Sequence, residues 1–328
     1  MAEQDNLPRW AGRPGGFEGW QLALTEPVSG RGIWIRAGLV APTSGAPRGE
    51  VVFATFHPAQ PERSLAIREH HSEDQFTLGG PDRYFRAGTA EVGPGFLRGT
   101  ALGGGHEASW DLTFPTGGSS YGLLPDLAAR GPLGATAAVV PNSGVLMTGE
   151  ATIDGDTLSV EDVPGEQWHM FGSRLPERWA WAHCSSFDGE EAVLEGFTGQ
   201  VRRGPYVTPF LTTIGLRRRG RWMRFTRLRG RRDFSMGYWR IDVADRRFRL
   251  TGRVEAPARA MVRAPLESPD GTLRHSHHTA TASCRLVLFE RRAGGYDEVA
   301  VLESRGLAQA EWAGRTAAAA VEREAAGA

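Results

Sequence analysis

The sequence has no lysine at all: its 38 basic residues are all arginine, balanced by 38 aspartates and glutamates. This absence excludes enzymes that depend on a lysine Schiff base, a pyridoxal phosphate anchor, a phosphate-loop lysine or a Ser-Lys dyad. Any proton carrier must therefore be His, Asp, Glu, Tyr or Cys. The formal net charge of zero also argues against a nucleic-acid-binding protein, because such proteins carry a basic field.

Cysteine and long apolar runs are scarce as well. The two cysteines, Cys184 and Cys284, are too few for a disulfide framework in 328 residues, so we expect two reduced thiols. No apolar stretch approaches the roughly 18 residues that span a bilayer, and the polar start of the chain lacks a secretory signal. These features predict a cytoplasmic protein without integral membrane association. No Gly-x-Gly-x-x-Gly follows a predicted strand, and we predict no cofactor.

Short runs typical of β-strands dominate the chain, separated by turns that use many of its 43 glycines and 20 prolines. Asp154-Gly155 and Asp188-Gly189 are tight-turn signals between such runs. These signals predict about 18 strands, and one small closed barrel uses about 8 to 10. We therefore predict an all-β fold of two tandem antiparallel barrels or sandwiches, with domains at residues 1–164 and 165–328. The alanine-rich residues 308–325 predict a C-terminal helix.

Aromatic residues gather in one part of the chain, where three of the ten tryptophans fall within 14 residues. Successive strand residues point to opposite faces, so Trp179, Trp181 and His183 share one face. Two indoles followed by an imidazole are typical of a cavity wall that contains one polar group. Glu166 and His169, just before them, would add a carboxylate–histidine pair for general acid/base catalysis. The alternative is a packed core with buried, hydrogen-bonded histidines.

The pattern Gly-x-x-x-His-x-Phe-Gly, followed by Trp-x-Trp-x-His-x-x-x-Phe, resembles that of a two-domain lipocalin-like superfamily. This superfamily includes hydroxyneurosporene synthase (carotenoid 1,2-hydratase), tocopherol cyclase-like proteins and lipocalin-like Diels–Alderases. The matching positions are Gly165, His169, Phe171, Gly172, Trp179, Trp181, His183 and Phe187. The resemblance is strongest over residues 145–200. It implies two lipocalin-like barrels that hold an isoprenoid or polyketide-like ligand, with chemistry by protonation or by shaping the substrate.

One position departs from the hydratase pattern, because Trp168 stands where an acidic residue precedes the histidine. The acid would then come from Glu166, Asp111 or Glu107, and Trp168 would either stabilise a carbocation through its π face or simply pack. The strand that contains Trp110 and Asp111 lies where the family has a comparable strand. The predicted catalytic residues are His169, His183 and Glu166. The predicted ligand-binding residues are Trp168, Trp179, Trp181, Phe171, Trp110 and Asp111.

The function indicated by this clustering and resemblance is a cofactor-independent isomerase, cyclase or hydratase that acts on a hydrophobic small molecule. One competing interpretation is a non-catalytic carrier of lipids or other hydrophobic ligands with the same barrels. Another is a structural or interaction module in which the Trp-x-Trp strand is ordinary core. The sequence gives no indication of the oligomeric state.

Two further clusters favour simpler interpretations. His275 and His277 would share a strand face, but no third ligand stands at a defined spacing, so we predict no metal site. The same strand could still bring a histidine to the rim of a pocket. Nine arginines within residues 217–232 straddle a predicted hairpin turn and alternate with apolar residues. They favour a solvated hairpin with charged edges over binding of nucleic acid or phosphate.

Overall fold

The structure is a computed structural model that describes residues 2–117, 120–124, 136–230 and 233–315. Strands dominate these ranges, which confirms the predicted all-β class. Their helical elements are short: α1 (Ala2–Asn6) and three 3-10 turns, η1 (Pro61–Arg63), η2 (Glu73–Gln75) and η3 (Ala258–Ala260). No helix in the described part of the chain is long and apolar enough to cross a membrane.

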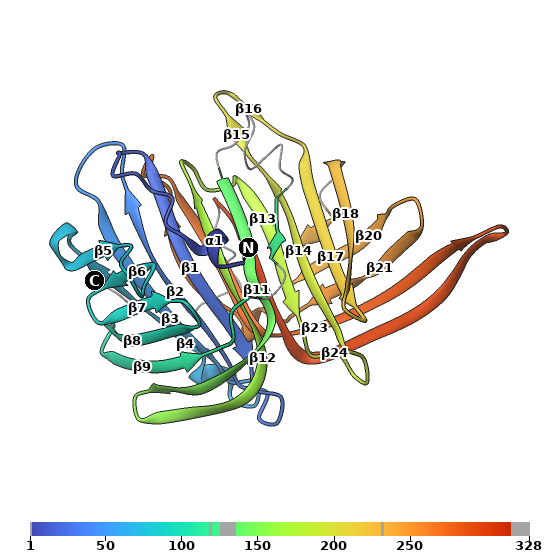
Figure 1. Cartoon of the computed structure of the whole chain (residues 1–328), viewed down its shortest axis with the longest axis horizontal. Helices are drawn as coiled ribbons and strands as arrows, with labels where there is room; N and C mark the ends of the chain where they lie inside the picture. The colour runs from blue at the N-terminus through green and yellow to red at the C-terminus, as the bar shows by residue number, and fades with distance from the viewer. Residues whose placement is uncertain (1, 118–119, 125–135, 231–232, 316–328) are drawn as a thin grey trace.

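The first sheet has twelve antiparallel strands in the order β4-β3-β2-β1-β12-β11-β9-β8-β7-β6-β5, and β10 pairs with β11. Its strands are β1 (Gly16–Thr25), β2 (Gly32–Ala41), β3 (Arg48–Phe56), β4 (Leu65–His71), β5 (Phe76–Leu78), β6 (Phe85–Ala87), β7 (Ala90–Gly93), β8 (Phe96–Gly103), β9 (His106–Thr113), β10 (Tyr121–Gly122), β11 (Thr136–Ile153) and β12 (Asp156–Gly172). The sheet curls until β4 contacts β8 and β9, so it is nearly closed (Figure 1). Trp20, Leu22 and Ile35 belong to the apolar core that it encloses.

The second sheet has ten strands in the order β18-β17-β14-β13-β24-β23-β21-β20-β19, and β22 pairs with β23. Its strands are β13 (Arg178–Cys184), β14 (Ala192–Gln200), β17 (Phe210–Arg218), β18 (Arg221–Gly230), β19 (Phe234–Ser235), β20 (Tyr238–Ala244), β21 (Phe248–Glu255), β22 (Val262–Glu267), β23 (Leu273–Arg292) and β24 (Gly295–Gly314). β18 comes close to β20, so this sheet also curls around a core. A separate small hairpin joins β15 (Arg202–Arg203) to β16 (Tyr206–Val207).

The outer faces of the two sheets pack together, with β1 and β2 of the first lying against β23 and β24 of the second (Figure 1). Alternate residues of a strand in this interface therefore face either a sheet's own core or the partner sheet. In β13, Ala180 and Ala182 lie in the second core, whereas Trp179 and Trp181 pack toward the first sheet. The predicted alternation of this strand is confirmed, and both of its faces are buried.

The predicted turns are also confirmed. Asp154 and Gly155 have positive φ angles of 48° and 81° and join β11 to β12 in a tight hairpin. Arg219 and Gly220 have φ angles of 52° and 72° and join β17 to β18, so the arginine run does straddle a hairpin turn. Left-handed backbone at both central residues is the geometry that matches the twist of paired strands.

The predicted C-terminal helix over residues 308–325 is wrong for its first part. Residues up to Gly314 belong to β24, which pairs with β13 on one side and β23 on the other; residues 316–328 lie outside the described residues. Alanine has high helix propensity, but two flanking strands supply a full ladder of long-range hydrogen bonds, and small alternate residues such as Ala308 and Ala310 fit the second core.

The chain passes from the first sheet to the second between Gly172 and Arg178. The predicted boundary between residues 164 and 165 therefore falls inside β12, a strand of the first sheet. That the two sheets are separate domains stays a prediction.

Candidate active site

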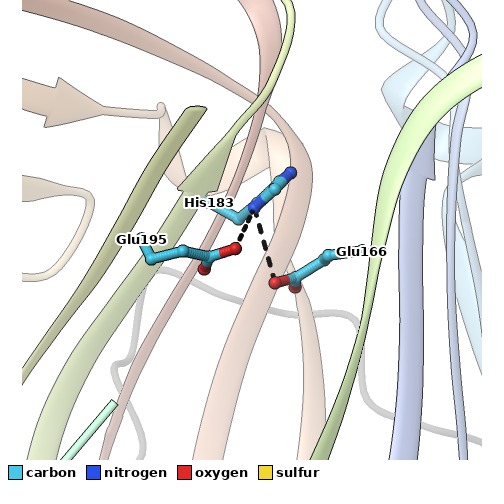
Figure 2. Close-up of side chains that lie close together, drawn as sticks. All are labelled: Glu166, His183 and Glu195. Carbon is cyan, nitrogen blue, oxygen red and sulfur yellow. Dashed lines mark hydrogen bonds and ion pairs between the residues drawn. The ribbon is translucent and has the colours of Figure 1, made fainter. Parts of the chain in front are cut away.

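Three ionisable side chains meet between the two sheets: Glu166 from β12, His183 from β13 and Glu195 from β14. We call them the acid cluster. Figure 2 shows Glu166 reaching across from one strand toward the other two side chains. All three have an exposed fraction of 0%. His183 Nδ1 lies 2.9 Å from Glu195 Oε1 and 3.5 Å from Glu166 Oε2.

Strand register brings these groups together. In the β13–β14 hairpin His183 is paired with Glu195, and in the β11–β12 hairpin Glu166 is paired with Ser143. Directly paired residues project to the same face of a sheet. The Ser143 hydroxyl donates to Glu195 Oε1 across the interface, and the Ser185 hydroxyl lies 3.1 Å from His183 Nε2. Two hairpins, one from each sheet, therefore fix the cluster.

Burial raises the pKa of Glu166 well above its ordinary value, and the charge of Glu195 and a hydrogen bond with that residue raise it further. Among the described residues, Glu166 has no other hydrogen-bond partner, and Glu195 Oε2 has none beyond this contact. One oxygen of each carboxyl group lies within 4.8 Å of the other, and two buried carboxylates this close repel strongly when both are ionised. The carboxylic acid form of Glu166 is therefore favoured.

A column of stacked rings lies beside the acid cluster. Trp168 is two residues from Glu166 on β12, and Trp181 is two residues from His183 on β13; their ring centroids are 5.6 Å apart at an interplanar angle of 14°. The column continues from Trp181 to His278 at 5.7 Å and from His278 to Trp34 at 4.3 Å. All four rings, which we call the aromatic column, are buried. Indole faces so close to an acid can stabilise a positive charge.

The predicted pairing of Glu166 with His169 is not formed, because the two side chains lie on opposite faces of β12. His169 points into the first barrel, where its Nε2 lies 2.8 Å from Glu18 Oε1 and its Nδ1 lies 2.7 Å from the Asp5 carbonyl. The Glu18 carboxylate also accepts two backbone N–H groups of the N-terminal segment, each at 2.7 Å. This pair is fully hydrogen-bonded and holds the N-terminal segment onto the barrel.

The remaining predicted ligand-binding residues lie in different places. Trp179 is buried in the interface next to the aromatic column. Trp110 packs in the first core against Phe53, and Asp111 is exposed on β9, so neither belongs to the acid cluster. Phe171 lines a cavity of about 520 Å³. The other residues that line this cavity are Asp5, Arg9, Ser120, Gly122, Leu124, Ala137, Ala138, Val139 and Arg224.

The acid cluster also has the donor types of a metal site. One ligand atom from each of the three side chains lies within 4.8 Å of the others, so a divalent cation could be held by an imidazole nitrogen and carboxylate oxygens. His183 Nδ1 already contacts Glu195, however, and a proton shared between the carboxyl groups compensates their charge without an ion. The sequence-based prediction of no metal stays a prediction.

A family model of tocopherol cyclase-like proteins matches residues 137–314, which include the acid cluster and three of the four rings in the aromatic column. The chain belongs to the tocopherol cyclase-like family. The uncharacterized protein Rv0493c of Mycobacterium tuberculosis (strain ATCC 25618 / H37Rv) is 26% identical over 294 residues, which cover 87% of this chain and 85% of that protein. The uncharacterized protein MT0513 of strain CDC 1551 / Oshkosh matches to the same extent.

Two solved structures are similar to this tocopherol cyclase-like chain. Kievitone hydratase from Nectria haematococca has a TM-score of 0.51 at 10% identity, over 95% of this chain and 92% of that one. A putative AttH from Nitrosomonas europaea has a TM-score of 0.44 at 13% identity, over 92% and 93%. The likeness to kievitone hydratase confirms the predicted lipocalin-like fold.

Sequence reasoning missed Glu195, Glu18 and the contribution of His278. Glu195 carries only a partial signal: the Asp188-Gly189 turn places β14 beside β13, but a two-residue hairpin centred there pairs His183 with Leu194, and the observed register is shifted by one residue. Glu18 has no such signal, because β1 and β12 are far apart in sequence and only the tertiary fold pairs them.

Proposed function

We propose that this tocopherol cyclase-like protein is a cofactor-independent enzyme that isomerises, cyclises or hydrates an isoprenoid or polyketide-like small molecule. The observation that carries the proposal is the fully buried Glu166, whose raised pKa and contact with Glu195 hold a proton beside stacked indoles. Family membership supports it, as does the name of a neighbour with the same fold, which is a hydratase. A buried acid among apolar and aromatic groups suits protonation of a carbon–carbon double bond.

The first step is transfer of the Glu166 proton to one carbon of the double bond. The π electrons of the substrate form the new C–H bond, and the neighbouring carbon is left as a cation. Trp168 lies two residues from Glu166 and stacks on Trp181, and an indole face turned toward the cation would stabilise it most where water is excluded. The carboxylate left on Glu166 lies 3.5 Å from His183 Nδ1.

The cation can then be resolved in three ways. Loss of a proton from an adjacent carbon gives isomerisation, attack by a substrate hydroxyl gives cyclisation, and addition of water gives hydration. Each route releases one proton, and the acid cluster is placed to take it back. His183 Nδ1 lies between the two carboxyl groups and can return the proton to Glu166. These reaction steps balance in atoms and electrons without a redox partner or a cofactor.

The test is conversion of isoprenoid and polyketide extracts by the purified protein, followed by mass spectrometry. We expect the wild type to consume a component that Glu166→Gln leaves intact, although the variant has nearly the same shape. Asp111→Asn is the matched control. Because Asp111 is exposed on the first sheet, this variant should convert the same component at the wild-type rate. Turnover by Glu166→Gln at the wild-type rate would contradict the proposal.

A non-catalytic carrier is the second candidate, and the cavity of about 520 Å³ favours it. This cavity is large enough for a small ligand, and it combines apolar residues such as Leu124 and Val139 with two arginines, Arg9 and Arg224. A ligand that co-purifies, is released unchanged and binds Glu166→Gln as tightly as wild type would favour the carrier.

A further inference from the structure

His278, the third ring of the aromatic column, is a fully buried polar group with an exposed fraction of 0%. Neither of its ring nitrogens has a hydrogen-bond partner in the part of the chain that the structure describes. Trp34 and Trp181 cover its two faces at 4.3 Å and 5.7 Å. Burial lowers the pKa of His278 to about 3, so the ring is neutral near neutral pH. A neutral imidazole offers one N–H donor and one nitrogen acceptor, and here both are unused.

The neighbouring histidine on the same strand, in contrast, has a hydrogen-bond partner. His277 projects to the opposite face of β23, where its Nδ1 lies 3.2 Å from the Trp312 carbonyl. Buried polar groups in folded proteins are almost always paired in this way, so each exception calls for an explanation. Gln309 Oε1, in the same interface, also has no hydrogen-bond partner among the described residues.

Strand register places His278 on the same face as the acid cluster. One row across the second sheet consists of Glu195, His183 and Gln309, and the next row consists of Trp181, Glu311 and His278. Rows two residues apart are separated by about 7 Å along a strand. A small molecule whose double bond lies at Glu166 could therefore place a second group at His278.

We infer that His278 binds a hydroxyl group of the substrate and so orients the double bond toward Glu166. A hydroxyl both donates and accepts, so it can pair with either nitrogen of the neutral ring, whereas an ether or carbonyl oxygen can only accept. Trp34 and Trp181 keep the imidazole in place and shield its hydrogen bond from water. The inference rests on the proposed function, since it assumes a hydrophobic substrate in the interface between the sheets.

The test uses the isoprenoid alcohol farnesol and its methyl ether, which differ in the hydroxyl proton. Binding is followed by quenching of tryptophan fluorescence, because two indoles flank the site. We expect wild type to bind the alcohol about tenfold more tightly than the ether, as one buried hydrogen bond allows. His278→Phe keeps a flat ring in the column and should bind both probes equally. Glu166→Gln should keep the tenfold preference, since it changes the acid and not the hydroxyl site.

The melting temperature provides a second readout with a matched control. His278→Phe removes an unpaired polar group and should melt at or above the wild-type temperature. His277→Phe, the same change one residue away, breaks an existing hydrogen bond and should melt lower. Equal affinities of wild type for alcohol and ether would overturn the inference while leaving the proposed function standing. No binding of either probe, or an unchanged preference in His278→Phe, would overturn the inference, while conversion of extracts by wild type and Glu166→Gln would still decide the proposed function.

Discussion

Two buried carboxylate–histidine pairs lie on opposite sides of the same strand, β12, and they differ in how completely they are hydrogen-bonded. Inside the first barrel, both nitrogens of His169 and the carboxylate of Glu18 have close partners. Between the sheets, the polar contacts of Glu166 with described residues are limited to the other members of the acid cluster. The first pair stabilises a segment of the fold, whereas the second leaves reactive groups available.

This difference shows that a buried histidine and an adjacent carboxylate do not by themselves form a catalytic pair. A carboxylate that accepts several hydrogen bonds is stabilised in its charged form, whereas one that is buried beside a like charge is pushed toward its neutral, proton-donating form. Burial and the charge of Glu195 raise the pKa of Glu166 in this way. Chemistry is therefore expected at the acid cluster, and structural support at Glu18 and His169.

The largest expected effect comes from making the same substitution in both regions. Glu166→Gln should lower turnover by about 10²- to 10⁴-fold, the usual contribution of a general acid. Glu18→Gln should leave turnover nearly unchanged at a temperature where the variant is folded. The measurement is the rate of product formation by mass spectrometry. Equal losses of turnover in both variants would contradict the assignment of a catalytic role to Glu166 and a structural role to Glu18.

Stability should respond in the opposite sense. Glu18→Gln replaces a fully buried carboxylate that accepts three hydrogen bonds, and we expect it to lower the free energy of unfolding by about 2 to 3 kcal/mol. Glu166→Gln should not destabilise the fold, because the protonated carboxyl group is already neutral and the amide N–H can replace its O–H in the hydrogen bond with Glu195. Denaturant titration of both variants checks this, and a larger loss in Glu166→Gln would argue against a shared proton.

The raised pKa of Glu166 should be visible in the pH dependence of the free energy of unfolding. Its folded-state pKa is raised, so below its ordinary value of 4.5 the carboxyl is protonated in both folded and unfolded chains. As pH rises above that value, the unfolded chain releases the proton and the folded chain keeps it. Wild type should therefore lose up to about 1.4 kcal/mol of stability per pH unit relative to Glu166→Gln, until the raised pKa is passed. Parallel pH profiles of unfolding would contradict this.

A smaller effect is expected for the indoles. Trp181→Phe keeps an aromatic ring but weakens cation stabilisation, and turnover should fall by about tenfold. Trp20→Phe is the control inside the first barrel, where Trp20 stacks on His169 at 4.5 Å; it should lose some stability and keep its turnover. Steady-state kinetics separates the two, and unchanged turnover in Trp181→Phe would remove the indole from the mechanism.

The smallest expected effect is that of a chelator. Because the proton shared within the acid cluster already compensates its charge, removal of divalent cations should leave turnover unchanged. The measurement compares turnover before and after dialysis against a chelator. Loss of activity that returns on adding a single divalent cation would show that the cluster holds a metal.

Much of the fold could be predicted because its signals are local. Turn residues such as Asp154-Gly155 and the alternation of Trp179, Trp181 and His183 depend on a few neighbouring residues, and the structure confirms both. The C-terminal helix failed because alanine content is a local preference, whereas β24 is decided by pairing with two distant strands. Long-range register is therefore what a single sequence shows least.

For the candidate site, too, the local signals could be predicted and the tertiary arrangement could not. Glu166 and His183 were predicted members, and the structure places them together, whereas His169, the predicted partner of Glu166, lies on the other face of β12. The tertiary fold, and not the local sequence, decides which face of β12 packs against the second sheet. The bulges between Val139 and Asn142 and between Ser143 and Val145 in the β11–β12 hairpin further obscure the register from the sequence.

The claim that Glu166 carries a proton in the folded protein is tested most directly by infrared difference spectroscopy at neutral pH. A protonated carboxyl group has a carbonyl stretching band that an ionised carboxylate lacks. The pKa of buried Glu311 is also raised, so the band of Glu166 is isolated by subtracting the spectrum of the variant from that of wild type. We predict that the spectrum of wild type minus Glu166→Gln shows this band at neutral pH, and that the spectrum of wild type minus Glu18→Gln does not. A spectrum of wild type minus Glu166→Gln without the band would contradict the assignment of Glu166 as the acid.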